Sequence, residues 1–287
     1  MAHHGQAQMV RPDPLAEDHE LPGFDPQFIT RNGITSIVGI PSVKRVNKPI
    51  LEEAHRYLYR FDEQGRTIYT NTSFGNPGSG SDTASIVTTY DEEGRVVNRL
   101  FKELSGQFSL ELHYDSLDRI VRSTYIRLHD RRSARIPEPD SGITIISDEH
   151  IRHERWNDTT TMRLYLNADE RPYRKQVITT NKDGYVLSIE DGYVISGRRS
   201  RTSFTYQERG WLHERTTKID GDASGPSRLV HSYDVAGNLL ASDLYRGDVH
   251  TRHDEYLYDD RTMYLKARLS KNMETGMINI IKYTVVR

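Results

Sequence analysis

Short stretches in which apolar and polar residues alternate run along most of the chain. Clear cases are 67–70, 96–100 and 201–206, which are rich in Val, Ile, Thr, Tyr and Phe. Alternation with a period of two is typical of a β-strand with one buried and one exposed face. The pattern therefore predicts an all-β protein.

A turn motif of the form Tyr-Asp-x-x-Gly-Arg recurs between these stretches. Clean copies begin at Phe61-Asp62, Tyr90-Asp91 and Tyr233-Asp234, and degenerate copies begin at Tyr114-Asp115, Leu166-Asn167, Tyr206-Gln207 and Tyr258-Asp259. Asp at the first position of a tight turn accepts hydrogen bonds from the following backbone, and Gly three residues later takes positive φ. The motif predicts a type I turn closed by a left-handed Gly and a bulge. Asp118 suits the Gly position, whereas Glu170 and Thr262 suit it less well, so those two turns are expected to be longer or of another type.

The spacing of the motif predicts how the strands are connected. Most copies lie about 25 residues apart, which is room for two strands and a second turn. The interval between Asp115 and Asn167 is twice as long, so an unrecognised turn is expected near 137–142. The second turns vary in length and lie at 75–80, 105–106, 181–184, 221–225, 246–248 and 275–276. We expect a long antiparallel meander of about 12–16 strands in a single continuous sheet, curled or barrel-like, with uniform turns along one edge and variable loops along the other.

The N-terminal segment differs from the rest of the chain. Residues 1–26 contain several Pro and acidic residues and little apolar periodicity. We expect an extended or mobile arm over 1–30 and one β domain over 31–287, in which 33–40 forms a lead strand.

Composition and charge exclude several classes of protein. The formal net charge is −2, from 39 basic and 41 acidic residues, which argues against a nucleic-acid partner. The mean hydropathy of −0.72 argues against a membrane-spanning barrel, whose outward positions must form an apolar band. The chain has no Cys, which excludes disulfides and thiolate chemistry. Residues 1–8 contain no signal-peptide core, although 5–8 is similar to the end of a signal region, so a periplasmic or cell-surface location after export is expected.

Two histidine clusters are candidate metal sites. His150 and His153 lie within 149–154, but on a strand their spacing puts them on opposite faces. His250 and His253 precede Asp254 and Glu255 in a second cluster. Polar surface is the favoured interpretation of both, so we predict no catalytic, cofactor-binding or metal-binding residue, no cofactor and no enzymatic activity.

The remaining candidates also favour structural interpretations. The glycine-rich segment 75–80 lacks the Lys-Ser/Thr pair of a phosphate loop, and the basic clusters 131–135 and 197–201 are expected to be solvated surface. The Tyr residues before the turn Asp positions are expected to pack across neighbouring strands with their hydroxyl groups at the sheet margin.

The repeated Tyr-Asp-x-x-Gly-Arg/Asn pattern over 57–127 and 204–260 resembles the YD repeats of the Rhs family. That resemblance implies a β-sheet ribbon that can spiral around a toxin, although this chain is far shorter than such a shell. The lead-in 34–48 followed by the repeat sheet is also loosely similar to the plug subunit of the type nine secretion system translocon.

The leading functional hypothesis is a non-catalytic protein of the cell envelope that binds another protein, such as an accessory subunit of an outer-membrane export complex, without itself spanning the membrane. The alternative is a carbohydrate-active or glycan-binding β-protein with its site in the variable loops. A surface adhesin is a third hypothesis.

Overall fold

The computed structural model describes residues 8–15, 23–75, 84–129 and 142–287. These residues form one helix and nineteen strands. Their bounds are α1 Pro26–Arg31, β1 Ser36–Lys44, β2 Ile50–Glu52, β3 Arg56–Phe61, β4 Thr67–Phe74, β5 Ala84–Tyr90, β6 Val96–Glu103, β7 Gly106–Tyr114, β8 Ile120–Leu128, β9 Ile143–Arg155, β10 Thr160–Leu166, β11 Pro172–Thr180, β12 Val186–Tyr193, β13 Arg199–Tyr206, β14 Leu212–Ile219, β15 Ser227–Tyr233, β16 Leu239–Arg246, β17 Val249–Tyr258, β18 Leu265–Asn272 and β19 Ile278–Val286. No helix within these ranges is long and apolar enough to cross a membrane.

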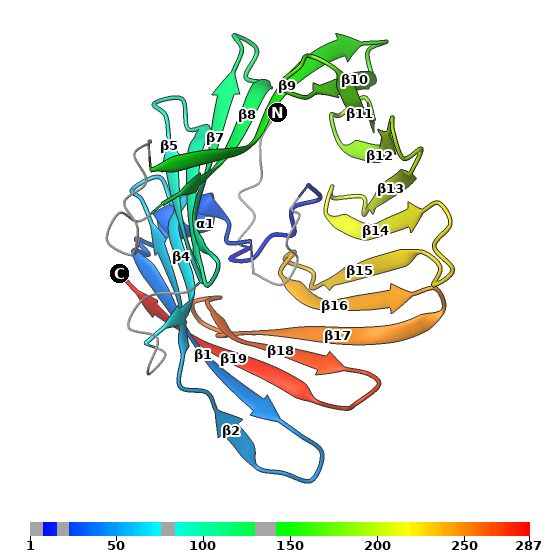
Figure 1. The fold of residues 1–287 in the computed structure, drawn as a ribbon. Helices are drawn as coiled ribbons and strands as arrows, with labels where there is room; N and C mark the ends of the chain where they lie inside the picture. The colour runs from blue at the N-terminus through cyan, green and yellow to red at the C-terminus, as the bar shows by residue number, and fades with distance from the viewer. Residues whose placement is uncertain (1–7, 16–22, 76–83, 130–141) are drawn as a thin grey trace.

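The strands form a single closed antiparallel barrel (Figure 1). From β3 to β19 each strand pairs with the next, and β1 pairs with both β3 and β19 and so joins the two ends of the sheet. The short strand β2 pairs only with the end of β1, at Ser42–Lys44. The barrel therefore has 18 strands. Closure leaves no edge strand in the ring with unpaired backbone groups.

The all-β, single-sheet prediction is confirmed, but the expected 12–16 strands were too few. Between Asp115 and Asn167, β8, β9 and β10 make three strands, where two repeat units would make four. An odd number of strands moves the turn at Asn167 to the opposite end of the barrel from the turn at Asp115. The turn expected near 137–142 falls almost wholly outside the described residues.

The two ends of the barrel differ in their connections. One end, the tight-turn rim, carries the turns at Asp62, Asp91, Asp115, Trp156–Thr160, Asn181, Gln207, Asp234 and Asp259. The other end, the loop rim, carries the remaining connections, including the turn at Asn167. The predicted pairing of one uniform edge with one variable edge is therefore confirmed, with the turns at Asn167 and Asn181 exchanged between the two edges.

The turns at Glu170 and Thr262 behave differently from each other. Glu170 takes positive φ (58°) and closes a turn of the same form as the glycine copies, so the expected deviation there was wrong. The turn at Asp259 is one residue longer, and Met263 takes the positive φ (57°) in place of Thr262. At both positions a non-glycine residue takes the left-handed conformation in a turn whose first residue accepts a backbone hydrogen bond.

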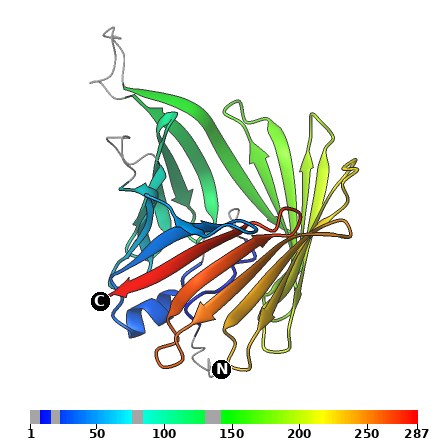
Figure 2. The same ribbon diagram turned by 90° about the horizontal axis from the view of Figure 1, so that it is seen from below.

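The described part of the N-terminal arm lies inside the barrel rather than outside it (Figures 1 and 2). Met9 and Val10 are buried, and Val10 forms an isolated bridge with Phe24. Asp25 caps α1 by accepting a hydrogen bond from Phe28 N at 3.0 Å, and Pro26 begins the helix. The arm expected to be extended or mobile is thus packed against the barrel wall over its described residues.

The arm supplies part of the hydrophobic core. Its apolar side chains pack against the inward-facing side chains of strands near the tight-turn rim: Ile37, Tyr59, Phe61, Leu239, Tyr256, Leu265 and Tyr283. Phe24 contacts Tyr59 edge to face with the ring centroids 5.0 Å apart. Each such buried side chain contributes roughly 1.5–3 kcal/mol. The arm therefore lies in the lumen near the tight-turn rim.

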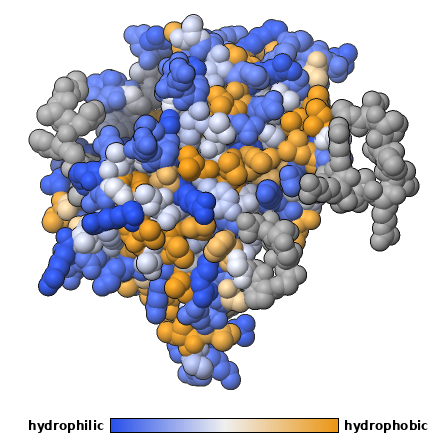
Figure 3. Space-filling model, turned by 90° about the vertical axis from the view of Figure 1, so that its left-hand side faces the viewer, coloured by the Kyte–Doolittle hydropathy of each residue, from blue (hydrophilic) through white to orange (hydrophobic). Residues whose placement is uncertain are grey.

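These core contacts identify the two faces of the sheet. Tyr256 faces the lumen, so Asp254 and Arg252 face it too, while His253 and Leu257 face outward. The outer face is mixed in character. Exposed charged side chains stand on it at Lys175, Glu190, Lys218 and Lys271, whereas Figure 3 shows apolar side chains gathered in a band over the side formed by β4 to β8.

Candidate functional site

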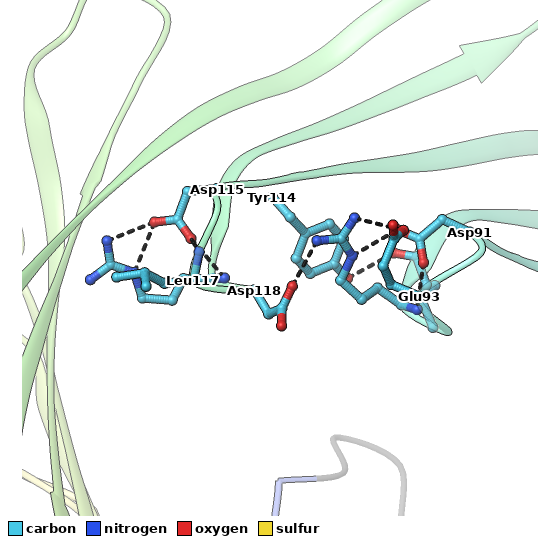
Figure 4. A network of polar contacts seen from close by, with 9 residues as sticks. Asp91, Glu93, Tyr114, Asp115, Leu117 and Asp118 are labelled. Atoms are coloured by element: carbon cyan, nitrogen blue, oxygen red, sulfur yellow. Dashed lines mark hydrogen bonds and ion pairs between the residues drawn. The ribbon is translucent and has the colours of Figure 1, made fainter.

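The side chains of the turn motif make hydrogen bonds and ion pairs within and between neighbouring turns (Figure 4). The carboxylate of Asp91 accepts hydrogen bonds from Arg95 N at 2.8 Å and Arg95 Nε at 2.7 Å. Tyr114 donates its hydroxyl hydrogen to Val96 O at 2.8 Å, and the Arg95 guanidinium lies 4.9 Å from the Tyr114 ring centroid. Tyr90 bonds to Thr67 O in the same way. The predicted cross-strand role of these tyrosines is confirmed.

A cavity of about 720 Å³ lies toward the loop rim of the lumen. It lies between β1 and β3 to β6 on one side and β17 to β19 on the other. Its walls combine aromatic, aliphatic and polar side chains, among them Tyr57, Phe101, Ile86, Ile281, Arg252, Arg268, Asn272 and Asn279. The volume suits a small organic molecule.

Two arginines of the cavity wall share one buried carboxylate. Arg268 Nη2 donates to Asp254 Oδ2 at 3.0 Å, and Arg252 Nε lies 3.2 Å from the same oxygen. Asp254 is 1% exposed and Arg268 is 5% exposed. With two guanidinium groups for one carboxylate, this Arg252-Asp254-Arg268 cluster carries a net positive charge at the edge of the cavity.

Arg268 stays charged despite its burial. Burial lowers the pKa of the Arg268 guanidinium, but Tyr256 and Asp254 beside it outweigh burial and hold that pKa above its ordinary value. Burial likewise raises the pKa of Tyr283, so its phenol is neutral near pH 7. A fixed positive charge in a low-dielectric pocket attracts an anion more strongly than the same charge in water.

The cavity also offers contacts for an uncharged part of a ligand. Tyr57 and Phe101 present aromatic surface, and Asn279 offers an amide donor and acceptor. The amide oxygen of Asn272 is occupied in its own turn, where it accepts a hydrogen bond from Thr275 N at 2.8 Å. Aromatic rings beside amide groups can contact the carbon body and the hydroxyl groups of a polar organic molecule. The arrangement can therefore bind an anion that carries an organic body.

The histidines of the first cluster do not converge. His150 lies on the outer face of β9 and its Nδ1 contacts Glu170 Oε1. His153 lies on the other face, where its Nε2 is 2.7 Å from Ile120 O. The predicted separation of these two histidines is confirmed.

The second cluster is divided between the two faces of β17. Asp254 belongs to the lumen, whereas His250 and His253 lie together on the outer face, both in contact with Asp243. Sequence reasoning grouped Asp254 with its neighbours and missed its partner Arg268. Arg252 and Asp254 lie two residues apart and therefore on the same face of the strand, but the sequence did not indicate which face was internal.

Of the two basic clusters, 131–135 lies outside the described residues. Arg201 stands on the outer face of β13, where it is 3.5 Å from Glu190. This exposed ion pair agrees with the predicted solvated strand surface.

The fold and the site define a closed β-barrel with a ligand-sized cavity in its lumen, lined by Glu53 and Glu103 as well as by the two arginines of the cluster. No family model matches the chain, and no curated protein matches it in sequence. Among solved structures, a porin-like protein from Bacteroides uniformis is similar at 10% identity, covering 88% of this chain and 98% of that chain with a TM-score of 0.38. A porin-like protein from Bacteroides vulgatus is similar at 8% identity, covering 88% and 98% with a TM-score of 0.35. A chain of the Photorhabdus luminescens Tc holotoxin pore is similar at 13% identity, covering 78% of this chain and 15% of that chain with a TM-score of 0.25.

The resemblance to the YD repeats of the Rhs family, and with it the looser similarity to the translocon plug subunit, was wrong. No family model supports either assignment, and the repeats close into one 18-strand barrel. The physical reason lies in the motif. The Asp-x-x-Gly sequence indicates a type I turn with a bulge. Any antiparallel barrel with short hairpins can use that turn, so the motif does not indicate a particular family.

Proposed function

We propose that the protein is a non-catalytic binding protein whose lumen holds a small organic anion bearing a carboxylate or phosphate group. The observation that carries the proposal is the Arg252-Asp254-Arg268 cluster, in which two guanidinium groups at the cavity wall share one carboxylate. Guanidinium groups bind carboxylate and phosphate oxygens through paired hydrogen bonds. The position of the cavity near the loop rim also supports the expected alternative of a ligand site close to the variable loops.

The test uses two sugars that differ only at C6, where galactose carries a hydroxymethyl group and galacturonate carries a carboxylate. Galacturonate and galactose are titrated separately into the protein, with glucose 6-phosphate as a second anion, and binding is followed by calorimetry and by the shift in Tm. We expect the two anions to bind and galactose to bind at least tenfold more weakly, because a charged hydrogen bond contributes about 1.5–3 kcal/mol. NMR of the bound sugar is expected to show no turnover.

A matched pair of variants locates the site. Arg252→Gln removes a cation from the cavity and is expected to abolish binding of the anions. Arg201→Gln removes an exposed cation from the outer face and is expected to leave binding unchanged. Equal binding of galactose and galacturonate, or full binding by Arg252→Gln, would contradict the proposal.

A second candidate function is docking on another protein of the cell envelope, which the apolar side of the barrel favours. On the strands of that side, the register runs along the outer face from Tyr69 through Val87, Leu100, Ser109 and Ile126 to Ile145. Ser109 and Ile126 are buried in this row, and Val87 is 36% exposed. Ile145 is 60% exposed. Exposed apolar rows bordered by polar surface favour a protein contact.

An envelope location forms part of this second candidate. Closed barrels of 16–18 strands are the size of outer-membrane porins. The exposed charges at Lys175, Glu190, Lys218 and Lys271 interrupt the apolar band that lipid requires. We therefore propose a barrel that contacts an envelope partner through its apolar side and does not itself span the membrane.

Substitution of one outward isoleucine tests this docking. Tagged Ile145→Lys is expected to lose a partner that the parent retains in cross-linked envelope fractions. Leu257→Lys, at an exposed apolar position on the outer face of β17, is expected to retain it. Loss of the partner in both variants, or in neither, would count against a contact at this row.

A further inference from the structure

Three potential metal ligands meet on the outer face of the barrel, away from the luminal site. Asp243 comes from β16, and His250 and His253 come from β17. Asp243 Oδ1 lies 2.7 Å from His253 Nδ1 and 2.9 Å from His250 Nε2. One ligand atom from each residue lies within 4.8 Å of the other two.

A β-bulge brings the two histidines together. In a regular strand, residues three apart face opposite sides of the sheet. Here the pairing of β16 with β17 shifts between Leu244 and Tyr245, so that Tyr245 pairs with His250 and Leu244 with Arg252. The extra residue, Thr251, turns His250 onto the same face as His253. Bulges commonly redirect a side chain at a functional position.

The surroundings hold the imidazoles in place. Tyr245 stacks on His250 with the ring centroids 4.7 Å apart and an interplanar angle of 22°. Glu255 Oε1 lies 3.2 Å from His253 Nε2, on the far side of the ring from Asp243. A carboxylate that hydrogen-bonds one imidazole nitrogen leaves the other nitrogen able to bind a metal, and such support is typical of metal-binding histidines.

We propose that Asp243, His250 and His253 bind a divalent transition-metal ion of the zinc class, with Glu255 as a positioning residue. Two imidazole nitrogens and one carboxylate oxygen make a donor set that zinc accepts, leaving a fourth position for water. The three side chains are each about 30% exposed, so an ion can reach them from solvent. The present distances between ligand atoms are those of hydrogen bonds, and a small outward rotation of the side chains makes room for the ion. The site does not depend on the proposed luminal ligand.

The test is a titration of the full chain with zinc chloride alone. His3 and His4 also offer imidazoles, so the titration is run on a chain carrying His3→Gln and His4→Gln. We expect one zinc ion per chain, and we expect Asp243→Asn and His253→Gln each to weaken binding by about tenfold or more. His113→Gln, which removes an exposed histidine from β7, is the control and is expected to bind zinc as the parent does.

A second measurement keeps the result independent of how the variants fold. Zinc is added to the parent chain while the imidazole NMR signals are recorded, and the signals of His250 and His253 are expected to shift together at one equivalent. Absence of zinc binding by the parent, shifts confined to other histidines, or unchanged binding in both Asp243→Asn and His253→Gln would overturn the proposal.

Discussion

At the scale of single residues, the turn motif depends on a side-chain oxygen atom of its first residue, which accepts backbone hydrogen bonds whether or not it carries a charge. Asp115 Oδ1 accepts hydrogen bonds from Leu117 N at 2.9 Å and Arg119 N at 3.0 Å. Asn167 and Asn181 accept the corresponding bonds with an uncharged amide oxygen. What the carboxylate adds is its ion pair with the arginine that ends the motif, which for Asp115 and Arg119 measures 2.6 Å.

That ion pair predicts an acid-sensitive contribution to stability. The Arg119 side chain, assisted by backbone N–H groups, lowers the pKa of Asp115 to about 2. Because this pKa is below the unfolded value of about 3.9, the ionised carboxylate stabilises the fold above about pH 4, and the effect disappears as the pH falls toward 2. Asp115→Asn is therefore expected to be less stable than the parent at pH 7, with the difference shrinking from pH 4 downward.

Urea unfolding of both proteins between pH 7 and pH 2.5 measures that difference. Asn181→Asp is the control, because the fifth residue of its turn is Tyr185, which offers no guanidinium group. Its stability relative to the parent is expected to depend less on pH. A difference between parent and Asp115→Asn that stayed constant over the whole range would contradict the assignment.

At the scale of elements, α1 is held by the first tight turn of the barrel. Gly65 takes positive φ (75°), and a Cβ atom built there would lie 2.2 Å from Pro26 O and 2.5 Å from Thr30 Oγ1. The turn between β3 and β4 thus fits against the helix backbone only because its fourth residue has no side chain. Gly184 also takes positive φ (87°) in another tight turn, but a Cβ atom there would have nothing within 4 Å.

The two glycines separate backbone strain from helix docking. Gly184→Ala is expected to cost about 1–2 kcal/mol of unfolding free energy from its left-handed backbone alone. Gly65→Ala carries the same strain and also displaces α1, so a loss larger by about 1–3 kcal/mol is expected. Urea unfolding monitored by circular dichroism makes the comparison, and equal losses would show that the contact with α1 contributes nothing.

At the scale of the whole molecule, closure of the barrel pairs its first strand with its last. β1 and β19 pair from Ser36 with Val286 to Lys44 with Ile278, although these strands are the first and last in sequence order. Closure defines the inside of the sheet, and with it both the space filled by the arm and the cavity lined by Arg252 and Arg268.

A disulfide can test the closure and its register, since the chain has no Cys. Val38 and Thr284 are paired on the outer face, so Val38→Cys with Thr284→Cys is expected to form a disulfide on oxidation and to raise the unfolding free energy by about 2–4 kcal/mol. Val38→Cys with Ile278→Cys places the second thiol six residues along β19, or about 20 Å away, and is expected to stay reduced. Thiol titration and mass spectrometry distinguish the two. Equal oxidation of both pairs would contradict the register.

The sequence was sufficient for those features that depend on neighbours along the chain. Period-two alternation predicted the strands, and Asp62-x-x-Gly65 and its copies predicted the turns, because both follow from backbone geometry within a few residues. Alternation has two equivalent faces, however, and the face that becomes internal depends on the pairing of β1 with β19 across the whole chain. The placement of Met9 in the lumen, the cluster of Asp254 with Arg268, and the bulge that turns His250 toward His253 follow from that closure and from the register between strands, which local patterns do not contain.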